Sequence, residues 1–178
     1  MPIVTIPNLL SLSRIVFVPA LIAALAVRAE LLAVSIFSVV VISDFLDGFI
    51  ARRWHQLSAR GALIDHGSDA VFVSSMTGYF AYLGVLPPML PVLIAVAFIQ
   101  YSIDSGKQRN TGLRASSIGR WNGIAYFVIT GLAVAVHLFI VDSLARDILN
   151  SFAYLLCVST GVSILARAAH FFSERGRA

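Results

Sequence analysis

The stretch SDFLDGFIARRWHQLSARGALIDHGSD, residues 43–69, places acidic side chains among apolar runs. Its four aspartates are Asp44, Asp47, Asp65 and Asp69. A carboxylate in such apolar surroundings is costly, because a charged group loses its hydration when it enters a hydrocarbon environment. Acidic residues that occur in such a setting indicate a functional site, and the rest of the chain indicates what kind of site it is.

The composition indicates an integral membrane protein. Of the 178 residues, 58% are hydrophobic and 12% are charged, whereas a soluble domain has about 45–50% apolar and about 25% charged residues. The length and the lack of a linker-like segment predict a single domain over residues 1–178. The net charge of +4 fits basic loops beside anionic lipid, so we expect no nucleic-acid partner.

Six segments are long enough to cross a bilayer, which takes about 20 mostly apolar residues. We therefore predict an all-α polytopic membrane protein with six transmembrane helices, at about 9–27, 31–53, 60–85, 87–105, 116–141 and 143–172. Six spans put both termini on one side. That side would hold eleven of the thirteen Lys and Arg residues, and the other side would hold only Arg28 and Arg146. Because positive residues favour the cytoplasm, we expect both termini and the acidic stretch at the cytoplasmic face.

The spacing of the aspartates predicts that they form one site. Asp44 and Asp47 are three residues apart, and Asp65 and Asp69 are four apart, so each pair shares one face of a helix. The short loop between these helices makes them antiparallel neighbours, so the two acidic faces can meet. Unpaired carboxylates at close range repel strongly in a low dielectric, and hard divalent cations with oxygen ligands would neutralise them. Two such ions also suit displacement at phosphorus.

Two other interpretations of the acidic cluster stay open. The aspartates could form an ion-pair network with Arg52, Arg53 or Arg60, which lie close by in the chain. They could also form the binding site of a small cation or proton transporter, because ionisable residues within spans often mark an ion pathway.

Small residues flank the carboxylates. Gly48, Ala51 and Gly61 leave stretches of helix backbone uncovered, which a nucleotide base or ribose could approach closely. The same residues also fit close packing of one helix on another, so alone they do not indicate a nucleotide site.

The residues of the opening stretch together form a specific motif. They spell Asp44-x-x-Asp47-Gly48-x-x-Ala51-Arg52, then, after eight residues, Gly61-x-x-x-Asp65-x-x-x-Asp69. This pattern resembles the motif of the CDP-alcohol phosphotransferase family at all eight positions. The run IPNLLSLSRIVFVP, residues 6–19, is similar to the first-span pattern of bacterial phosphatidylglycerophosphate synthases, which are the nearest likeness.

The resemblance implies a six-helix fold, commonly a homodimer, that transfers a substituted phosphate from a CDP-linked lipid donor to an alcohol and releases CMP. It implies two Mg²⁺ or Mn²⁺ ions held by Asp44, Asp47, Asp65 and Asp69, with Asp69 also acting as general base on the acceptor hydroxyl. It further implies a nucleotide site formed by Gly48, Ala51, Arg52 and Gly61. The expected location is a prokaryotic cytoplasmic membrane, with the active site facing the cytoplasm.

The substrate is less closely indicated than the reaction. The phosphatidylglycerophosphate synthase pattern usually has Pro after the third aspartate and Lys after the fourth, whereas this chain has His66 and Ala70. The leading hypothesis is transfer of a phosphatidyl group from CDP-diacylglycerol to a small polar alcohol, such as glycerol 3-phosphate or an inositol phosphate. The run DHGSD is closer to choline and ethanolamine phosphotransferases, so the alternative is a CDP-linked headgroup donor with a lipid alcohol acceptor.

Basic residues near the predicted cytoplasmic face are candidates for the acceptor site. Arg109, Arg114 and Arg120 lie around the start of the fifth span, and an arginine there can bind a phosphate through two parallel hydrogen bonds. A basic cytoplasmic loop accounts for the same cluster. Arg14 could reach the region from the first span. His66 is either a substrate contact or a histidine at the membrane interface.

Overall fold

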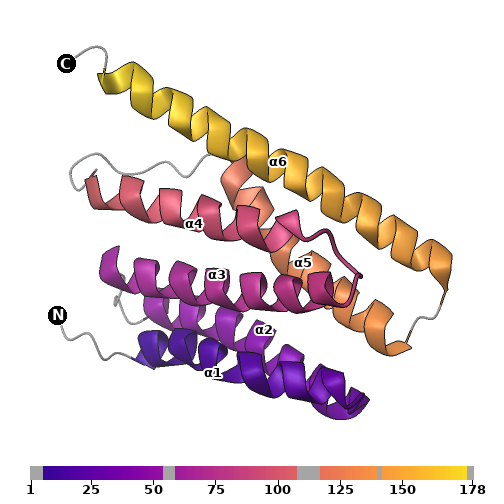
Figure 1. Ribbon diagram of the computed structural model, residues 1–178. Coiled ribbons are helices and arrows are strands. Elements are labelled where there is room, and N and C mark those ends of the chain that lie inside the picture. Colours follow the sequence, from indigo (N-terminus) through magenta and orange to yellow (C-terminus); the bar gives the residue numbers. More distant parts are fainter. Residues whose placement is uncertain (1–5, 54–58, 108–116, 140–141, 176–178) are drawn as a thin grey trace.

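Six helices make up the part of the chain that the structure, a computed structural model, describes (Figure 1). The described residues are 6–53, 59–107, 117–139 and 142–175; inside the helices, no side chain is described at 6–7, 47–49, 51–52, 59–60, 104–107, 117–118 and 170–175. The helices are α1 (Ile6–Ala26), α2 (Glu30–Arg53), α3 (Ala59–Tyr82), α4 (Met89–Lys107), α5 (Ser117–Phe139) and α6 (Ser143–Arg175). The predicted all-α architecture is confirmed.

The helices run alternately up and down one bundle. Helix α1 packs on α2 and α3, α3 packs on α4, and α6 packs on both α4 and α5. Figure 1 shows α5 crossing the bundle obliquely, while the start of α1 and the end of α6 lie toward the same end. The end of α2 and the start of α3 also lie there, while α5 begins farther inside the bundle. We call this shared end the aspartate end, because it carries Asp44, Asp65 and Asp69.

Two tight turns at the opposite end of the bundle stop α1 and α3. Arg28 (φ 54°) and Gly84 (φ 71°) adopt the left-handed conformation that commonly ends a helix. After Gly84, the amide of Val85 donates to the carbonyl of Phe80 at 2.8 Å. Helix α3 therefore ends at Tyr82, three residues before the predicted limit of 85.

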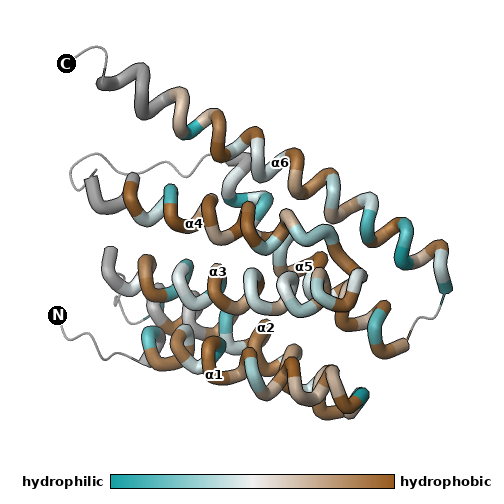
Figure 2. The backbone as a smooth tube through the Cα atoms, in the orientation of Figure 1, coloured by the Kyte–Doolittle hydropathy of each residue, from teal (hydrophilic) through white to brown (hydrophobic). Residues whose placement is uncertain are grey.

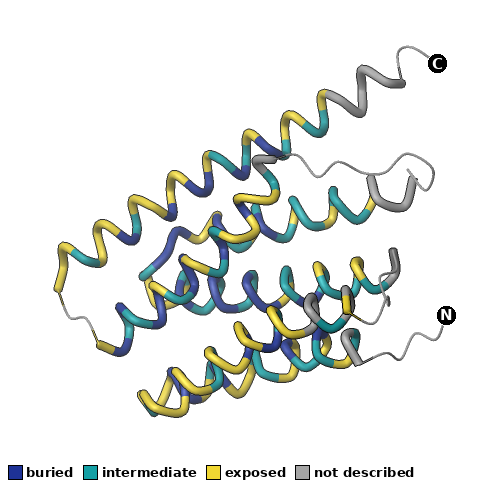
Figure 3. The backbone as a smooth tube through the Cα atoms, turned by 180° about the vertical axis from the view of Figure 1, so that it is seen from behind, coloured by how far each residue is buried: buried dark blue, intermediate teal, exposed yellow. Residues whose placement is uncertain are grey.

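Apolar side chains fill the centre of the bundle and also cover its outside. Phe72 is fully buried, and its ring stacks on that of Phe127 at a centroid distance of 5.9 Å. On the outside, Val16, Leu31 and Leu165 are at least two-thirds exposed. Figure 2 shows apolar residues along the helices, and Figure 3 shows exposed residues along most of α6. An apolar outer surface of this kind suits a protein surrounded by lipid, because exposed apolar side chains carry no free-energy penalty in hydrocarbon.

Three helices are long and apolar enough to cross a membrane, judged by length and composition over the described residues. These stretches are Asn8–Ala26, Gly119–Phe139 and Ser143–Ala169, and Met89–Ile103 is a shorter apolar helix. Polar residues such as Asp65, His66 and Asp69 lower the hydropathy of α3, although its 24 residues reach far enough. Six spans, rather than three, stays a prediction.

Replacing Phe72 with alanine should destabilise the bundle, because the cavity left behind loses the packing of a fully buried ring. The expected loss is about 3–5 kcal/mol, the usual range for Phe→Ala in a core. Val71→Ala, at a neighbouring side chain that is 43% exposed, is the matched control. Thermal unfolding in detergent, followed by intrinsic fluorescence, measures both variants. Equal unfolding temperatures would contradict the packing described here.

Candidate functional site

One arginine, Arg14, joins the acidic faces of α2 and α3 among the side chains that the structure describes. Arg14, from α1, is completely buried. Its Nη2 lies 3.0 Å from Oδ1 of Asp44, and its Nη1 lies 3.2 Å from Oδ1 of Asp65. Nη1 also donates to Oδ1 of Asp69. The hydroxyl of Ser11, one turn before Arg14, donates to Oδ1 of Asp65 at 3.2 Å. The predicted meeting of the two acidic faces is therefore present for these three aspartates.

The three carboxylates are partly exposed to solvent, whereas the Arg14 side chain is not. The side chains of Asp44, Asp65 and Asp69 are 40%, 33% and 23% exposed, against 0% for Arg14. Arg14 thus approaches the cluster from the α1 side, which is closed. A ligand can reach the carboxylates from their open side.

The ion-pair interpretation named arginines that are close to the aspartates in sequence. In the structure, the arginine that pairs with them is Arg14, which is distant in sequence. Arg53 is exposed at the end of α2, and the side chains of Arg52 and Arg60 lie outside the described part. Arg14 reaches the cluster because α1 packs against both α2 and α3. One guanidinium offsets one of the three carboxylate charges, so the cluster still favours a further cation.

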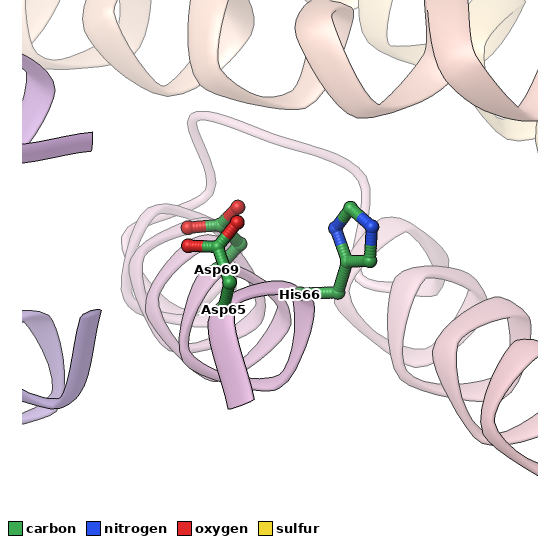
Figure 4. Close-up of side chains that lie close together, drawn as sticks. All are labelled: Asp65, His66 and Asp69. Atoms are coloured by element: carbon green, nitrogen blue, oxygen red, sulfur yellow. The ribbon is translucent and has the colours of Figure 1, made fainter. Parts of the chain in front are cut away.

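The residues of α3 fit a divalent metal ion. Ligand atoms of Asp65, His66 and Asp69 all lie within 4.8 Å of one another. Figure 4 shows the carboxyl groups of Asp65 and Asp69 side by side, with the His66 ring farther round the helix. Carboxylate oxygens are the ligands that Mg²⁺ prefers, while Mn²⁺ also accepts imidazole nitrogen. The donor set thus fits the predicted ions, without indicating which one binds.

A large cavity opens beside the carboxylates. It has a volume of about 650 Å³ and is lined by residues of α2, α3, α4, α5 and α6. Asp44 and Asp69 lie on its wall, together with apolar side chains such as Val73, Ile94 and Phe127. A mostly apolar cavity with a few polar groups at one place is the usual form of a small-molecule site.

Two arginines line the same cavity. Arg120, in the first turn of α5, is exposed and was predicted from the sequence. Arg167, on α6, was not predicted as a site residue, and its guanidinium carbon lies 5.6 Å from the centre of the Tyr101 ring. The His66 ring meets the same Tyr101 ring edge-on at 5.3 Å. The signal available in the sequence was a lone arginine within the apolar run SILARAAHFF.

Polar side chains farther along α5 and α6 also line the cavity and were missed. The hydroxyls of Tyr126 and Thr160 are 2.8 Å apart, and both residues line the cavity. The Ser159 hydroxyl donates to Oδ1 of Asn122 at 2.8 Å. These bonds tie α5 to α6, so they hold one wall of the cavity in place.

Several predicted site residues lie outside what the structure describes. Helix α2 includes the backbone of Asp47, Gly48, Ala51 and Arg52, but the side chains of Asp47, Ala51 and Arg52 and the surroundings of Gly48 are outside the described part. Arg109 and Arg114 also lie outside the described residues. Gly61 is described, and it lies on α3 one turn before Asp65.

Comparison with known proteins gives consistent matches. The model of the family described as CDP-alcohol phosphatidyltransferase matches residues 4–165. A "Probable phosphatidylglycerophosphate synthase" of Mycobacterium tuberculosis is 30% identical over 178 residues, covering 93% of this chain and 82% of that protein. The "CDP-diacylglycerol--glycerol-3-phosphate 3-phosphatidyltransferase" of Salmonella choleraesuis is 38% identical over 72 residues, covering 39% of this chain and 40% of that protein.

A second group of similar proteins carries another name. The "Cardiolipin synthase (CMP-forming)" of Rattus norvegicus is 37% identical over 91 residues, covering 51% of this chain and 30% of that protein. The chain spans less than half of the length of the cardiolipin synthases of rat, human and Streptomyces coelicolor that it matches.

Proposed function

This chain belongs to the CDP-alcohol phosphatidyltransferase family, and from that premise we propose that it moves a phosphatidyl group from CDP-diacylglycerol to a small polar alcohol, releasing CMP. The resemblance seen in the motif is thereby confirmed as to family. The observation that carries the proposal is the gathering of Asp44, Asp65 and Asp69 beside a cavity that also holds Arg120 and Arg167.

The reaction exchanges one phosphorus–oxygen bond for another. The acceptor hydroxyl oxygen forms a bond to the phosphatidyl phosphorus, and the bond from that phosphorus to the oxygen of CMP breaks. CMP leaves with the electron pair. Asp69 takes the proton of the acceptor hydroxyl as general base, because its carboxylate lies on the cavity wall.

The four aspartates, Asp69 included, provide negative charge for two divalent cations, Mg²⁺ or Mn²⁺. Asp44, Asp47, Asp65 and Asp69 would hold the ions, which would neutralise charge on the phosphate oxygens when bound. Gly48, Ala51, Arg52 and Gly61 receive the nucleotide. The grouping of carboxylates from α2 and α3 around Arg14 supports the metal part of this assignment.

The arrangement in the membrane is part of the proposal. We infer one domain over residues 1–178, six spans and a location in a prokaryotic cytoplasmic membrane, with a homodimer as the assembled form. Arg53 ends α2 at the aspartate end, and Arg120 and Arg167 line the same cavity as the aspartates. Arg28 follows the end of α1 and Arg146 lies near the start of α6, both toward the other end. This distribution supports cytoplasmic termini and an active site that faces the cytoplasm.

The acceptor is proposed to carry a phosphate, as glycerol 3-phosphate does. Two relatives are named for transfer to glycerol 3-phosphate or for making phosphatidylglycerophosphate. Arg120 and Arg167 supply positive charge on the cavity wall for such a group. His66 and Arg167 both lie against the Tyr101 ring. Arg109 and Arg114 stay candidates for the same role.

An assay of CMP release tests the function. The full-length protein in detergent is given Mg²⁺ and labelled CDP-diacylglycerol with, in turn, glycerol 3-phosphate, an inositol phosphate or a lipid alcohol. Parallel reactions contain CDP-choline or CDP-ethanolamine with diacylglycerol. We expect CMP and a labelled phospholipid with glycerol 3-phosphate. CMP release only from CDP-choline or CDP-ethanolamine with diacylglycerol would favour the headgroup-donor alternative. No release from any CDP-linked donor would contradict both and leave the cation transporter to be tested by ion flux.

Replacing Arg120 with glutamine should weaken acceptor binding. The KM for glycerol 3-phosphate is expected to rise about 10- to 100-fold, because a hydrogen bond to a charged group is worth about 1.5–3 kcal/mol. The KM for CDP-diacylglycerol should stay unchanged. Arg146→Gln, at an exposed arginine near the start of α6, is the control. A rise confined to the KM for CDP-diacylglycerol would assign Arg120 to the donor instead, and an equal rise in both KM values would contradict a role specific to the acceptor.

A further inference from the structure

Arg14 places a buried positive charge among the carboxylates that are proposed to bind positive ions. Arg14 is a full positive charge with no exposed surface. Among the carboxylates proposed to bind metal, it contacts the three whose side chains are described, those of Asp44, Asp65 and Asp69. Each of these three contacts involves Oδ1 of the aspartate. The arginine therefore shares its partners with the ions.

Arg14 cannot move far when an ion binds. Its side chain is enclosed by the packing of α1 on α2 and α3, and leaving the carboxylates would strand a buried charge. An ion lies about 2.1 Å from its carboxylate oxygens. Nη1 of Arg14 lies 3.2 Å from Oδ1 of Asp65, so an ion on that oxygen is at most about 5 Å from the guanidinium. Like charges at that separation repel appreciably even where the effective dielectric is high.

We propose that Arg14 is a built-in counter-cation, which holds the carboxylates of α2 and α3 together before metal binds and weakens the binding of the divalent ions. The inference rests on the metal site of the proposed function. It makes Arg14 a positioning residue for the metal ligands. The proposal predicts two opposite effects of removing Arg14. The metal-free protein should be less stable, and its affinity for divalent ions should be higher.

The test measures Mn²⁺ binding directly, from the electron paramagnetic resonance signal of free Mn²⁺ over the full-length protein in detergent. Arg14→Gln keeps hydrogen-bond donors but removes the charge, and its Kd for Mn²⁺ should fall at least about tenfold. Arg14→Lys keeps the charge and should stay within about threefold of the unmodified protein. Ser11→Ala removes a neutral donor to Asp65 and should also stay within about threefold.

Thermal unfolding supplies a second readout. Without metal, Arg14→Gln should unfold at a lower temperature than the unmodified protein, because three carboxylates lose their common partner. Saturating Mn²⁺ should raise its unfolding temperature by more than it raises that of the unmodified protein, since tighter binding to the folded state gives more stabilisation.

The outcomes separate this inference from the proposed function. If the unmodified protein binds Mn²⁺ and Arg14→Gln binds it equally or more weakly, the counter-cation role is wrong and the metal site stands. If the unmodified protein binds no Mn²⁺, the metal site fails and the inference fails with it. Should Arg14→Gln not fold, the pair Asp44→Asn and Arg14→Gln/Asp44→Asn replaces it, because fewer charges repel there. At least about tenfold tighter binding in the double variant is expected, and equal or weaker binding overturns the inference.

Discussion

Asp69→Asn is expected to abolish phosphatidyl transfer while the protein still folds and keeps much of its Mn²⁺ binding, with a smaller loss of affinity than the loss of rate. A general base commonly contributes about 10²- to 10⁴-fold to a rate, and an amide cannot take the proton of the acceptor hydroxyl. The substitution keeps the size of the side chain. Asp69 is one of three described carboxylates around Arg14, so two remain to hold an ion.

The decisive measurement is the single-turnover rate of CMP release, made alongside Mn²⁺ binding. Asp147→Asn is the matched control, because Asp147 is an exposed aspartate near the start of α6. The control should leave both quantities unchanged. Turnover in Asp69→Asn close to that of the control would remove Asp69 as the base. A loss of Mn²⁺ binding as large as the loss of rate would make it chiefly a metal ligand.

Asp65→Asn is expected to fail in a different way, through the metal. Oδ1 of Asp65 accepts from Ser11 and lies 3.2 Å from Arg14, so the carboxylate is fixed in place on α3. Changing groups that merely support metal ligands costs about 10- to 100-fold in affinity, and loss of an anionic ligand itself should cost at least about 100-fold. We expect little CMP release at ordinary Mg²⁺ or Mn²⁺ concentrations.

The metal dependence distinguishes the two variants. Raising the Mn²⁺ concentration should restore part of the activity of Asp65→Asn, because the ligand set is weakened and the base is intact. It should restore none in Asp69→Asn. Unchanged Mn²⁺ affinity in Asp65→Asn would exclude Asp65 from the metal site, even if activity were lost.

The helices were predictable because hydropathy and spacing act locally along the chain. The expected segments 31–53 and 143–172 correspond to α2 (Glu30–Arg53) and α6 (Ser143–Arg175). The end of α3 was less predictable, since it depends on Gly84 taking a left-handed conformation in the following turn.

The shared acidic site was also predictable, but its cation was not. A spacing of four residues puts Asp65 and Asp69 on one face of any helix, and a short loop brings α2 against α3. Which side chain of α1 meets that face depends on how α1 is rotated about its axis. The arginines nearest in the chain were the natural candidates, and the buried partner is Arg14, 30 residues before Asp44.

The place of Arg167 in the site could not be predicted from the sequence either. This arginine is more than 90 residues from Asp69 in the chain, yet both line one cavity because α6 packs on α4 and α4 packs on α3. The spacing of residues within α6 gives no indication of which helices it packs against.

By itself, the sequence determined the helical class, the family and the pairing of acidic faces, because all three follow from residue types at short spacings. Only the tertiary structure decided that Arg14 lies among the aspartates and that Arg120 and Arg167 share their cavity. The physical reason is that contacts between distant helices are set by rotation and crossing of whole elements, which depend on the packing of every side chain between them.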